Sequence, residues 1–317
     1  MSWDPRYVVI GAGAIGGTVG VRLHEAGREV VLVARGAHLD AIRERGLRLD
    51  EPDRSRTVRS PAAGRVGEVG WRDGDVAVLC TKSQDTEPIL DDLRAAAPGA
   101  AVACLQNGVA NERLAAERFD RVQAVCVVLP AEHLEPGRVV AFAAGSAGIL
   151  DVGRYPDGVD ELTERIAGDL TAAGFSSRAT ASIMPWKYRK LLVNLGNAIE
   201  ATCGLDDPDL RALHSAARRE GERCLAAAGI GYVSRDEERR RRDGALGIRP
   251  VDGYARRGGS TWQSMLRGTG SVEADFLNGE IVALGRSHGV PTPVNSLLLA
   301  AVTQMARAGA KPGARTA

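Results

Sequence analysis

The sequence predicts an α/β protein in which a doubly wound parallel sheet is followed by an all-helical C-terminal domain. Three observations predict this class. Apolar runs alternate with helical segments over the first part of the chain, a glycine-rich turn links the first run to the first helix, and strand-like runs stop near Pro185. Apolar runs without an alternating pattern are typical of parallel strands covered by helices on both faces.

Five short apolar runs are expected to form the strands of this sheet. They are Arg6–Ile10, Glu29–Ala34, Asp75–Cys80, Ala100–Gln106 and Val122–Leu129. A helix follows the first run and ends near Gly27, a second helix covers residues 37–46, and the arginine-rich stretch after it is compatible with a hairpin. Further strand-like sequence occupies residues 138–153.

A glycine-rich turn lies between the first strand and the first helix, where Gly11, Gly13 and Gly16 form the pattern G-x-G-x-x-G. The first glycine permits a tight turn, the second lets the backbone approach a pyrophosphate, and the third allows close helix–sheet packing. The helix that begins near Ala14 and Ile15 would supply unpaired N–H groups to the phosphates. In this strand–turn–helix context the pattern favours dinucleotide binding over a turn without a ligand, which makes the sheet a Rossmann-type sheet.

The residue after the second strand bears on the choice of dinucleotide. A site that prefers NAD usually carries an acid there to bind the ribose hydroxyls, but this sequence has Arg35. An arginine cannot accept a hydrogen bond, whereas it can form a forked contact with a 2′-phosphate. We therefore expect NADP (NADPH) rather than NAD, the alternative being a solvated arginine at the end of a strand.

Polar residues follow the next two strands at the expected carboxyl edge of the sheet, where open α/β sheets bind ligands. Lys82 follows the third strand and Asn107 the fourth. Either side chain could face the cofactor or the substrate. Simple turn chemistry is the alternative for both, and especially for the Asn107–Gly108 pair.

From Pro185 onward the sequence predicts helices, which divides the chain near Ala179. Residues 1–179 are expected to form an NADP-binding Rossmann domain and residues 180–317 a helical substrate-binding and catalytic domain. The mixed-charge run at residues 235–243 is expected to be a solvated helix face or a loop. The predicted helices are Trp186–Cys203, Asp207–Ala228, Val272–His288 and Asn295–Ala308.

The first of these helices carries an unusual polar stripe. At about 100° per residue, Lys187, Lys190, Asn194 and Asn197 fall on one narrow face, while apolar residues occupy the rest. Hydride transfer to a carbonyl develops an alkoxide, which needs a proton or a positive charge. A lysine in a cleft suits this role because partial burial lowers its pKa. Lys190 is therefore the candidate proton donor, and Asn194, four residues on, shares its face.

Composition and charge exclude several other classes of protein. The net charge is +1 and aromatic residues make up 4% of the chain, which argues against a nucleic-acid or membrane-surface partner. No apolar run approaches the ~18 residues of a membrane span and no signal peptide is evident, so a cytoplasmic location is expected. The five cysteines lack CxxC spacing and are expected to be buried thiols. The histidines are scattered, so no metal is expected.

Six motifs in order resemble the 2-dehydropantoate 2-reductase (ketopantoate reductase) family: GAGAIGG, TKSQDT, LQNGV, KLLVNLGN, GGSTWQS and VEADFLNGEIVALGRSHGVPTPVN. The resemblance covers almost the whole chain. It implies a Rossmann domain followed by a helical domain, with the site between them. It also implies reduction of 2-dehydropantoate to (R)-pantoate with NADPH in coenzyme A biosynthesis.

The resemblance also implies roles for individual residues. Lys190 matches the family's general acid, and Asn194 matches its partner asparagine. Asn107 would lie by the nicotinamide and the substrate, and Lys82 would contact the cofactor. Glu273 would contact the substrate hydroxyl and the lysine, although an acid at a helix start is also favoured by the helix dipole alone.

The sequence departs from the family pattern in the expected substrate pocket. The typical S-M-L-Q-D stretch reads S-T-W-Q-S here, so either Ser260 or Thr261 could hold the substrate carboxylate. Some members carry a second asparagine at the position of Ala198, whereas this chain has Asn197 beside it. The reaction type is thus better specified than the substrate.

Three alternatives remain open at this point. One is a paralogous reductase that acts on another 2-keto acid. Another is a 3-hydroxy acid dehydrogenase of related architecture, although the glycine-rich lead-in of those enzymes is missing before Lys190. The third is a non-catalytic NADP-binding redox sensor. The apolar helices after Pro185 are compatible with a homodimer and equally with a closed helical core.

Overall fold

The computed structural model describes residues 4–204, 210–254, 256, 258–268, 270 and 272–314, which form two compact units. Unit 1 comprises Met1–Trp186 and Arg235–Arg256, and unit 2 comprises Lys187–Ser234 and Arg257–Ala317. The segment Arg235–Arg256 thus belongs with unit 1, although a division of the sequence near Ala179 assigns it to the second region.

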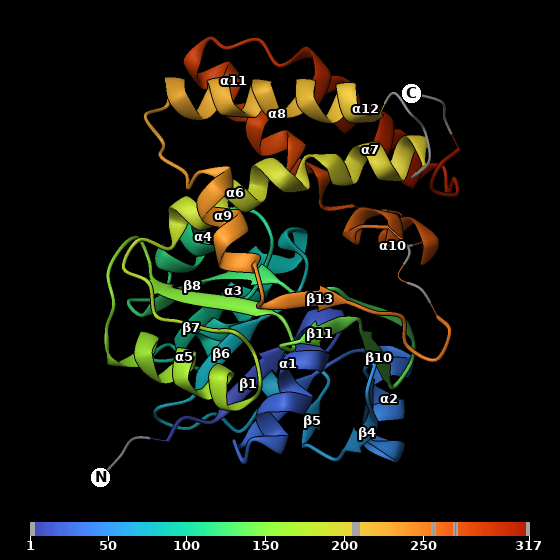
Figure 1. The fold of residues 1–317 in the computed structure, drawn as a ribbon. Helices are drawn as coiled ribbons and strands as arrows, with labels where there is room; N and C mark the ends of the chain where they lie inside the picture. Colours follow the sequence, from blue (N-terminus) through green and yellow to red (C-terminus); the bar gives the residue numbers. More distant parts are fainter. Residues whose placement is uncertain are drawn as a thin grey trace. The chain divides into compact units, whose positions relative to one another are not determined.

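Unit 1 is built on a seven-stranded sheet in the order β12-β8-β7-β6-β1-β2-β5 (Figure 1). All neighbouring pairs are parallel except β12 with β8, which is antiparallel. The predicted doubly wound sheet is confirmed. Its strands are β1 (Tyr7–Ile10), β2 (Val30–Val33), β5 (Ala62–Ala63), β6 (Val76–Leu79), β7 (Ala101–Cys104), β8 (Val122–Val128) and β12 (Ile149–Arg154).

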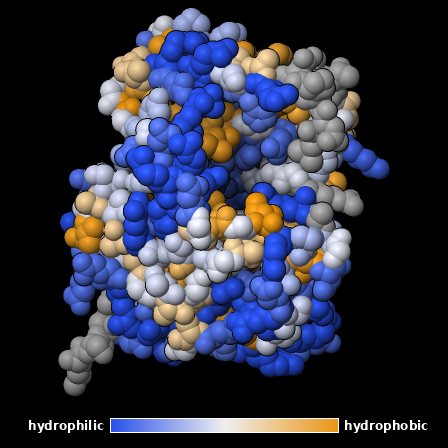
Figure 2. Space-filling model, viewed as in Figure 1, coloured by the Kyte–Doolittle hydropathy of each residue, from blue (hydrophilic) through white to orange (hydrophobic). Residues whose placement is uncertain are grey.

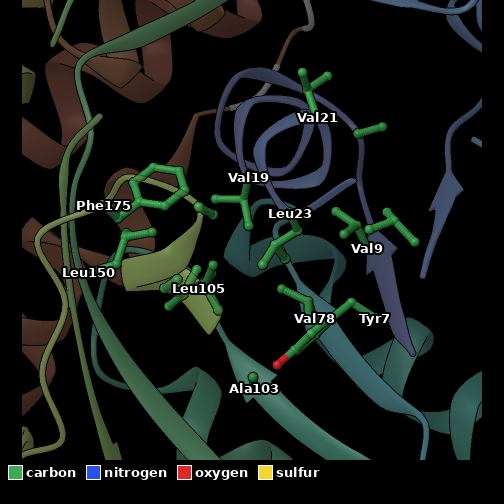
Figure 3. Close-up of a cluster of buried hydrophobic side chains, with 14 of the residues drawn as sticks. Tyr7, Val9, Val19, Val21, Leu23, Val78, Ala103, Leu105, Leu150 and Phe175 are labelled. Carbon is green, nitrogen blue, oxygen red and sulfur yellow. The ribbon is translucent and has the colours of Figure 1, made fainter. Parts of the chain in front are cut away.

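Both faces of this sheet are covered, as the apolar runs predict. Along β1, Tyr7 and Val9 belong to one buried cluster, while Val8 and Ile10 belong to another. Figure 3 shows the first cluster, which includes Val19 of the first helix. The helices of the two faces are α1 (Ala14–Glu25) and α5 (Glu161–Ala172) in the first cluster, and α3 (Thr86–Ala96) and α4 (Asn111–Ala116) in the second.

A second, four-stranded sheet also packs on α1, in the order β4-β3-β10-β9. The expected hairpin is confirmed, because β3 and β4 pair antiparallel. The pairing of this hairpin with residues 131–141 was not predicted. The strands are β3 (Leu47–Asp50), β4 (Ser55–Val58), β9 (Ala131–Glu135) and β10 (Arg138–Ala141).

The mixed-charge segment contributes a helix and a strand to unit 1. Helix α9 (Arg235–Arg242) has no buried residue, as expected for a solvated helix, but Arg241 forms two hydrogen bonds of 2.7 and 2.6 Å to Asp151 of β12. Strand β13 (Leu246–Ile248) pairs antiparallel with β11 (Ala143–Gly145). This strand was not predicted, because three residues are too few for a periodic pattern.

The elements of unit 2 in its described residues are helices and turns, and one predicted helix is interrupted. The predicted helix Trp186–Cys203 corresponds to α6 and α7, which meet at Leu195, where the backbone keeps helical angles (φ −56°, ψ −27°). Gly196, the first residue of α7, is packed so closely that a Cβ would lie 2.2 Å from the His214 ring. Leu277 (φ −119°, ψ −89°) separates a 3₁₀ turn from the helix after it. The elements are α6 (Met184–Asn194), shared with unit 1, α7 (Gly196–Cys203), α8 (Leu210–Ala227), α10 (Ser260–Leu266), the turn η3 (Glu273–Phe276), α11 (Asn278–His288) and α12 (Pro293–Arg307).

The predicted helix Asp207–Ala228 corresponds to α8, and its first three residues lie outside the described part of the chain.

On the face shown in Figure 2 the surface is largely hydrophilic, with hydrophobic residues in small separate groups. Within the described residues, every helix is too short or too polar to cross a bilayer.

Candidate functional site

The glycine-rich turn of unit 1 has the geometry that its sequence predicts. Gly11 has a φ of +98°, which favours glycine, and the N–H groups of Gly11 and Ala12 donate to the Val33 carbonyl at the end of β2. A Cβ on Gly16 would lie 2.2 Å from the Gly11 oxygen, so helix and turn leave no room for a side chain. A Cβ on Gly13 would meet only His133, at 3.9 Å. The backbone at Gly13 is therefore accessible to a ligand.

The start of α1 lacks the groups that usually satisfy a helix N-terminus. Gly13 is the cap residue, so no side chain accepts from the first-turn N–H groups, and this turn contains no acid. These N–H groups belong to Ala14, Ile15 and Gly16 at the open side of the turn. An uncapped N-terminus of a twelve-residue helix, next to an accessible glycine, fits the pyrophosphate of a dinucleotide.

Arg35 lies directly beyond β2 and caps helix α2 (Gly36–Arg45) through its backbone. Its side chain is 78% exposed, and its Nη2 atom lies 3.8 Å from Oδ2 of Asp85. An ion pair this long and this exposed contributes little. The guanidinium can therefore turn toward an anion at this edge of the sheet.

The loops that carry Lys82 and Asn107 are joined by side-chain hydrogen bonds that sequence reasoning did not identify. Gln106 donates to the Thr81 carbonyl at 3.0 Å and to the Thr86 hydroxyl at 2.9 Å. These bonds tie the loop after β7 to the loop after β6. Lys82 and Asn107 therefore each follow a residue, Thr81 or Gln106, whose position these hydrogen bonds fix.

Asn111, a buried residue at the start of α4, completes this network. Its Nδ2 donates to the carbonyl of Asn107 at 2.9 Å and to the hydroxyl of Ser83 at 3.1 Å, while its Oδ1 accepts from Thr86 at 2.8 Å. The Asn111 side chain therefore fixes the position of the Asn107 backbone carbonyl. A polar residue four positions after Asn107 at a helix start was the available sequence signal.

His38 is a second contributor that the sequence did not indicate. Its Nδ1 accepts from the Gly137 N–H at 2.8 Å, so its Nε2 carries the proton and donates to the carbonyl of Ala12 at 2.7 Å. The ring of His133 lies against it, with centroids 4.1 Å apart. Burial lowers the pKa of His38, although its bond to Ala12 acts in the opposite direction. The neutral imidazole thus links the glycine-rich turn to the β9–β10 connection.

In unit 2 the residues of the predicted polar stripe on α6 differ in how far their side chains are buried. Asn194 is 5% exposed, Lys187 is 3% exposed and Lys190 is half-buried. The apolar residues on the rest of the predicted helix are mostly buried, namely Leu191, Leu192, Leu195, Ala198 and Ile199, but Val193 is 38% exposed. Lys190 and Asn194 lie one turn apart on the same helix, so a basic donor and a neutral amide share one face.

The remaining predicted residues of unit 2 lie at the starts of short elements. Glu273 begins η3 and is 7% exposed. Ser260 begins α10 and is half-buried, and its hydroxyl accepts a 3.3 Å hydrogen bond from Nδ2 of Asn197. Thr261 is only 2% exposed. Of the two candidates for the substrate carboxylate, Ser260 is thus the more accessible.

Besides these groups of residues, the described part of the chain contains cysteines and possible metal ligands. All five cysteines lie in described parts of the chain and none forms a disulfide, and Cys104, Cys126 and Cys224 are buried. Over the residues that the structure describes, no three His, Cys, Asp or Glu side chains come together as metal ligands.

The fold and the glycine-rich turn define a class: a dinucleotide-binding α/β unit combined with a helical unit. Family models assign the chain more closely. The model "Ketopantoate reductase PanE/ApbA" matches residues 7–156, and the model of the C-terminal part of the same family matches residues 182–306. The chain belongs to the ketopantoate reductase family. Membership identifies an oxidoreductase that acts on a CH–OH group, and together with the glycine-rich turn it indicates a nicotinamide cofactor.

Relatives and solved structures agree with this assignment over nearly the full length. The chain is 32% identical to the 2-dehydropantoate 2-reductase of Halobacterium salinarum (91% of this chain, 95% of that protein) and 29% identical to that of Pyrococcus horikoshii (94% and 96%). A PanE/ApbA family ketopantoate reductase from Ralstonia eutropha shares the fold with a TM-score of 0.81 at 28% identity, covering 96% of this chain and 99% of that one.

A D-mandelate dehydrogenase, solved with NADH and anilino(oxo)acetate, has the same fold with a TM-score of 0.82 at 23% identity, covering 96% of this chain and 99% of that one. The fold is therefore shared by proteins whose named substrates differ.

Proposed function

We propose that the protein reduces a 2-keto acid to a 2-hydroxy acid with NADPH, and that its substrate is 2-dehydropantoate, which gives (R)-pantoate. The observation that carries this proposal is the pair Lys190 and Asn194, which share one face of α6 in the segment matched by the family's C-terminal model. The names of the curated relatives reported above support the choice of substrate.

In this proposal Lys190 is the general acid. NADPH, when bound, supplies the hydride that adds to the keto carbon. As negative charge develops on the keto oxygen, the Lys190 ammonium donates its proton there and the hydroxyl forms. Asn194 donates a hydrogen bond to the substrate from the next turn. Glu273 accepts a hydrogen bond from the new hydroxyl and orients the lysine, and Ser260 or Thr261 binds the substrate carboxylate.

The residues of unit 1 would hold the cofactor. The turn Gly11–Gly16 and the first-turn N–H groups of α1 bind the pyrophosphate. Arg35 forms a fork with the 2′-phosphate. Lys82 contacts the cofactor, and Asn107 approaches the nicotinamide and the substrate. Because the fold also occurs in a dehydrogenase solved with NADH, the choice of NADPH depends on Arg35 and not on the architecture.

A coupled test of substrate and cofactor is the oxidation of NADPH and NADH over a panel of 2-keto acids that includes 2-dehydropantoate. We expect the highest kcat/KM with 2-dehydropantoate and NADPH. Activity only on another 2-keto acid would replace the substrate but keep the chemistry. An absence of turnover over the whole panel would overturn the proposal.

A further inference from the structure

The start of α10 is held by two side chains of α7 that have no role in the function proposed above. Asn197 and Glu200 lie three residues apart, so they project from the same side of α7. Nδ2 of Asn197 donates to the Ser260 hydroxyl at 3.3 Å, and Oε2 of Glu200 accepts from the Gly259 N–H at 3.0 Å. One helix therefore fixes both the backbone and the side chain at this point.

The contact is too close to be incidental. A Cβ on Gly259 would lie 2.7 Å from Oδ1 of Asn197 and 3.2 Å from Oε2 of Glu200. Gly258 before it has a φ of +62°, a conformation that favours glycine. The Gly-Gly-Ser sequence is thus what allows α7 to approach, and the position of Ser260 is set by α7.

The direction of the hydrogen bond between Asn197 and Ser260 determines which further hydrogen bonds the serine hydroxyl can form. Because the Asn197 amide donates, it occupies a lone pair of the Ser260 oxygen and leaves the O–H group to donate elsewhere. Accepting one hydrogen bond polarises a hydroxyl and strengthens the bond it donates. Ser264 does not compete for this hydroxyl, since it donates to the backbone carbonyl of Ser260. The natural acceptor for such a donor is a carboxylate.

We propose that Asn197 is the positioning residue that makes Ser260, rather than Thr261, the hydroxyl donor to the carboxylate of the 2-keto acid. This inference depends on the reductase function proposed above and extends it by assigning the specificity for the acid end of the substrate. Thr261 is nearly inaccessible at 2% exposure and receives no bond from Asn197 in the described structure. The asparagine that is displaced by one residue from the family pattern thus has a specific partner.

The test is a double-mutant cycle on KM for the 2-keto acid, with kcat and the Kd for NADPH as companion readouts. Asn197→Ala removes the donor and is expected to raise KM about tenfold, the value of one hydrogen bond of about 1.4 kcal/mol. Asn197→Asp is close in shape but can only accept, so it captures the Ser260 proton and should raise KM further. Neither variant should change the Kd for NADPH.

The Ser260→Ala background separates this mechanism from direct charge repulsion. If Asn197 acts through Ser260, adding Asn197→Asp to Ser260→Ala should change KM less than twofold, whereas repulsion by the new carboxylate would persist. Ser287→Ala, which removes an exposed hydroxyl of α11, serves as the matched control and should leave KM unchanged. A role limited to packing predicts that Asn197→Asp is milder than Asn197→Ala.

Additive effects, or a normal KM in Ser260→Ala, would overturn this inference while the reductase function remains. An absence of 2-keto acid turnover in the unsubstituted protein would overturn both.

Discussion

The two units hold their candidate site residues in different ways. In unit 1 the residues lie in turns whose shape follows from the sequence, with Gly11 at a positive φ and Gly16 without room for a Cβ. In unit 2 they lie within α6 or at the first residues of α10 and η3, elements whose positions depend on packing between helices. The first kind of site is encoded locally, whereas the second depends on which helix packs on which.

The largest expected effect concerns unit 2 and follows from the proposed role of Lys190. Lys190→Ala should lower kcat about a thousandfold, since general acid catalysis contributes about 10²–10⁴ in rate. The Kd for NADPH should change little, because the proposed cofactor contacts lie in unit 1. Stopped-flow reduction and fluorescence titration measure the two quantities. Lys311→Ala, an exposed lysine, is the matched control and should behave like the unsubstituted protein.

Near-normal turnover in Lys190→Ala would remove the general acid from the proposal. A parallel loss of NADPH binding would instead indicate that α6 contributes to the cofactor site.

The next effect concerns unit 1 and the choice of cofactor. Arg35→Asp should lower the ratio of kcat/KM for NADPH to that for NADH by about 10- to 100-fold, because a charge-assisted fork is lost and a repulsive carboxylate is gained. Arg43→Asp, an exposed arginine on the same helix, controls for the change in net charge. An unchanged preference in Arg35→Asp would show that another group recognises the 2′-phosphate.

The glycines of the turn allow folding to be separated from binding. Gly16→Ala places a Cβ against the Gly11 oxygen and should destabilise unit 1 by about 1–3 kcal/mol, which lowers Tm by several degrees. Gly13→Ala meets nothing closer than 3.9 Å, so Tm should be unchanged while the Kd for NADPH rises several-fold. Calorimetry and titration check this pair. Equal losses of Tm in both variants would contradict it.

The features that could be predicted from the sequence are those encoded locally, and the features that depend on packing were missed. The strands of the large sheet other than β5, the conformational roles of Gly11 and Gly16 and the hairpin after α2 were predicted, because each depends on residues close together in the chain. The break at Leu277 was missed, since helical periodicity continues through this residue. Strand β13 was missed because its partner β11 lies far earlier in the chain, and the Asn111 network because Ser83 and Thr86 lie on a separate loop.

His38 provides the smallest expected effect. Burial lowers its pKa, so the folded protein keeps His38 neutral at pH values where the unfolded chain, with an ordinary pKa near 6.5, already binds a proton. The contribution of neutral His38 to the free energy of unfolding is therefore fully present above about pH 6.5 and is lost as the pH falls below that value. Protonation places a donor on Nδ1 opposite the Gly137 N–H, which breaks the link between that residue and the glycine-rich turn.

Thermal unfolding and NADPH titration between pH 7.5 and 5.5 measure this link. We expect Tm and NADPH affinity to fall together as the pH drops, and His38→Gln, which can still donate to Ala12 but does not titrate, to show a shallower fall. Burial also lowers the pKa of His214, and its contribution persists in His38→Gln, so the difference between the two profiles reports His38 and its contact with the His133 ring. His288→Gln, an exposed histidine of unit 2, should leave the profile unchanged. Identical profiles for His38→Gln and the unsubstituted protein would show that the turn keeps its shape without this imidazole, and that its glycines alone determine the geometry.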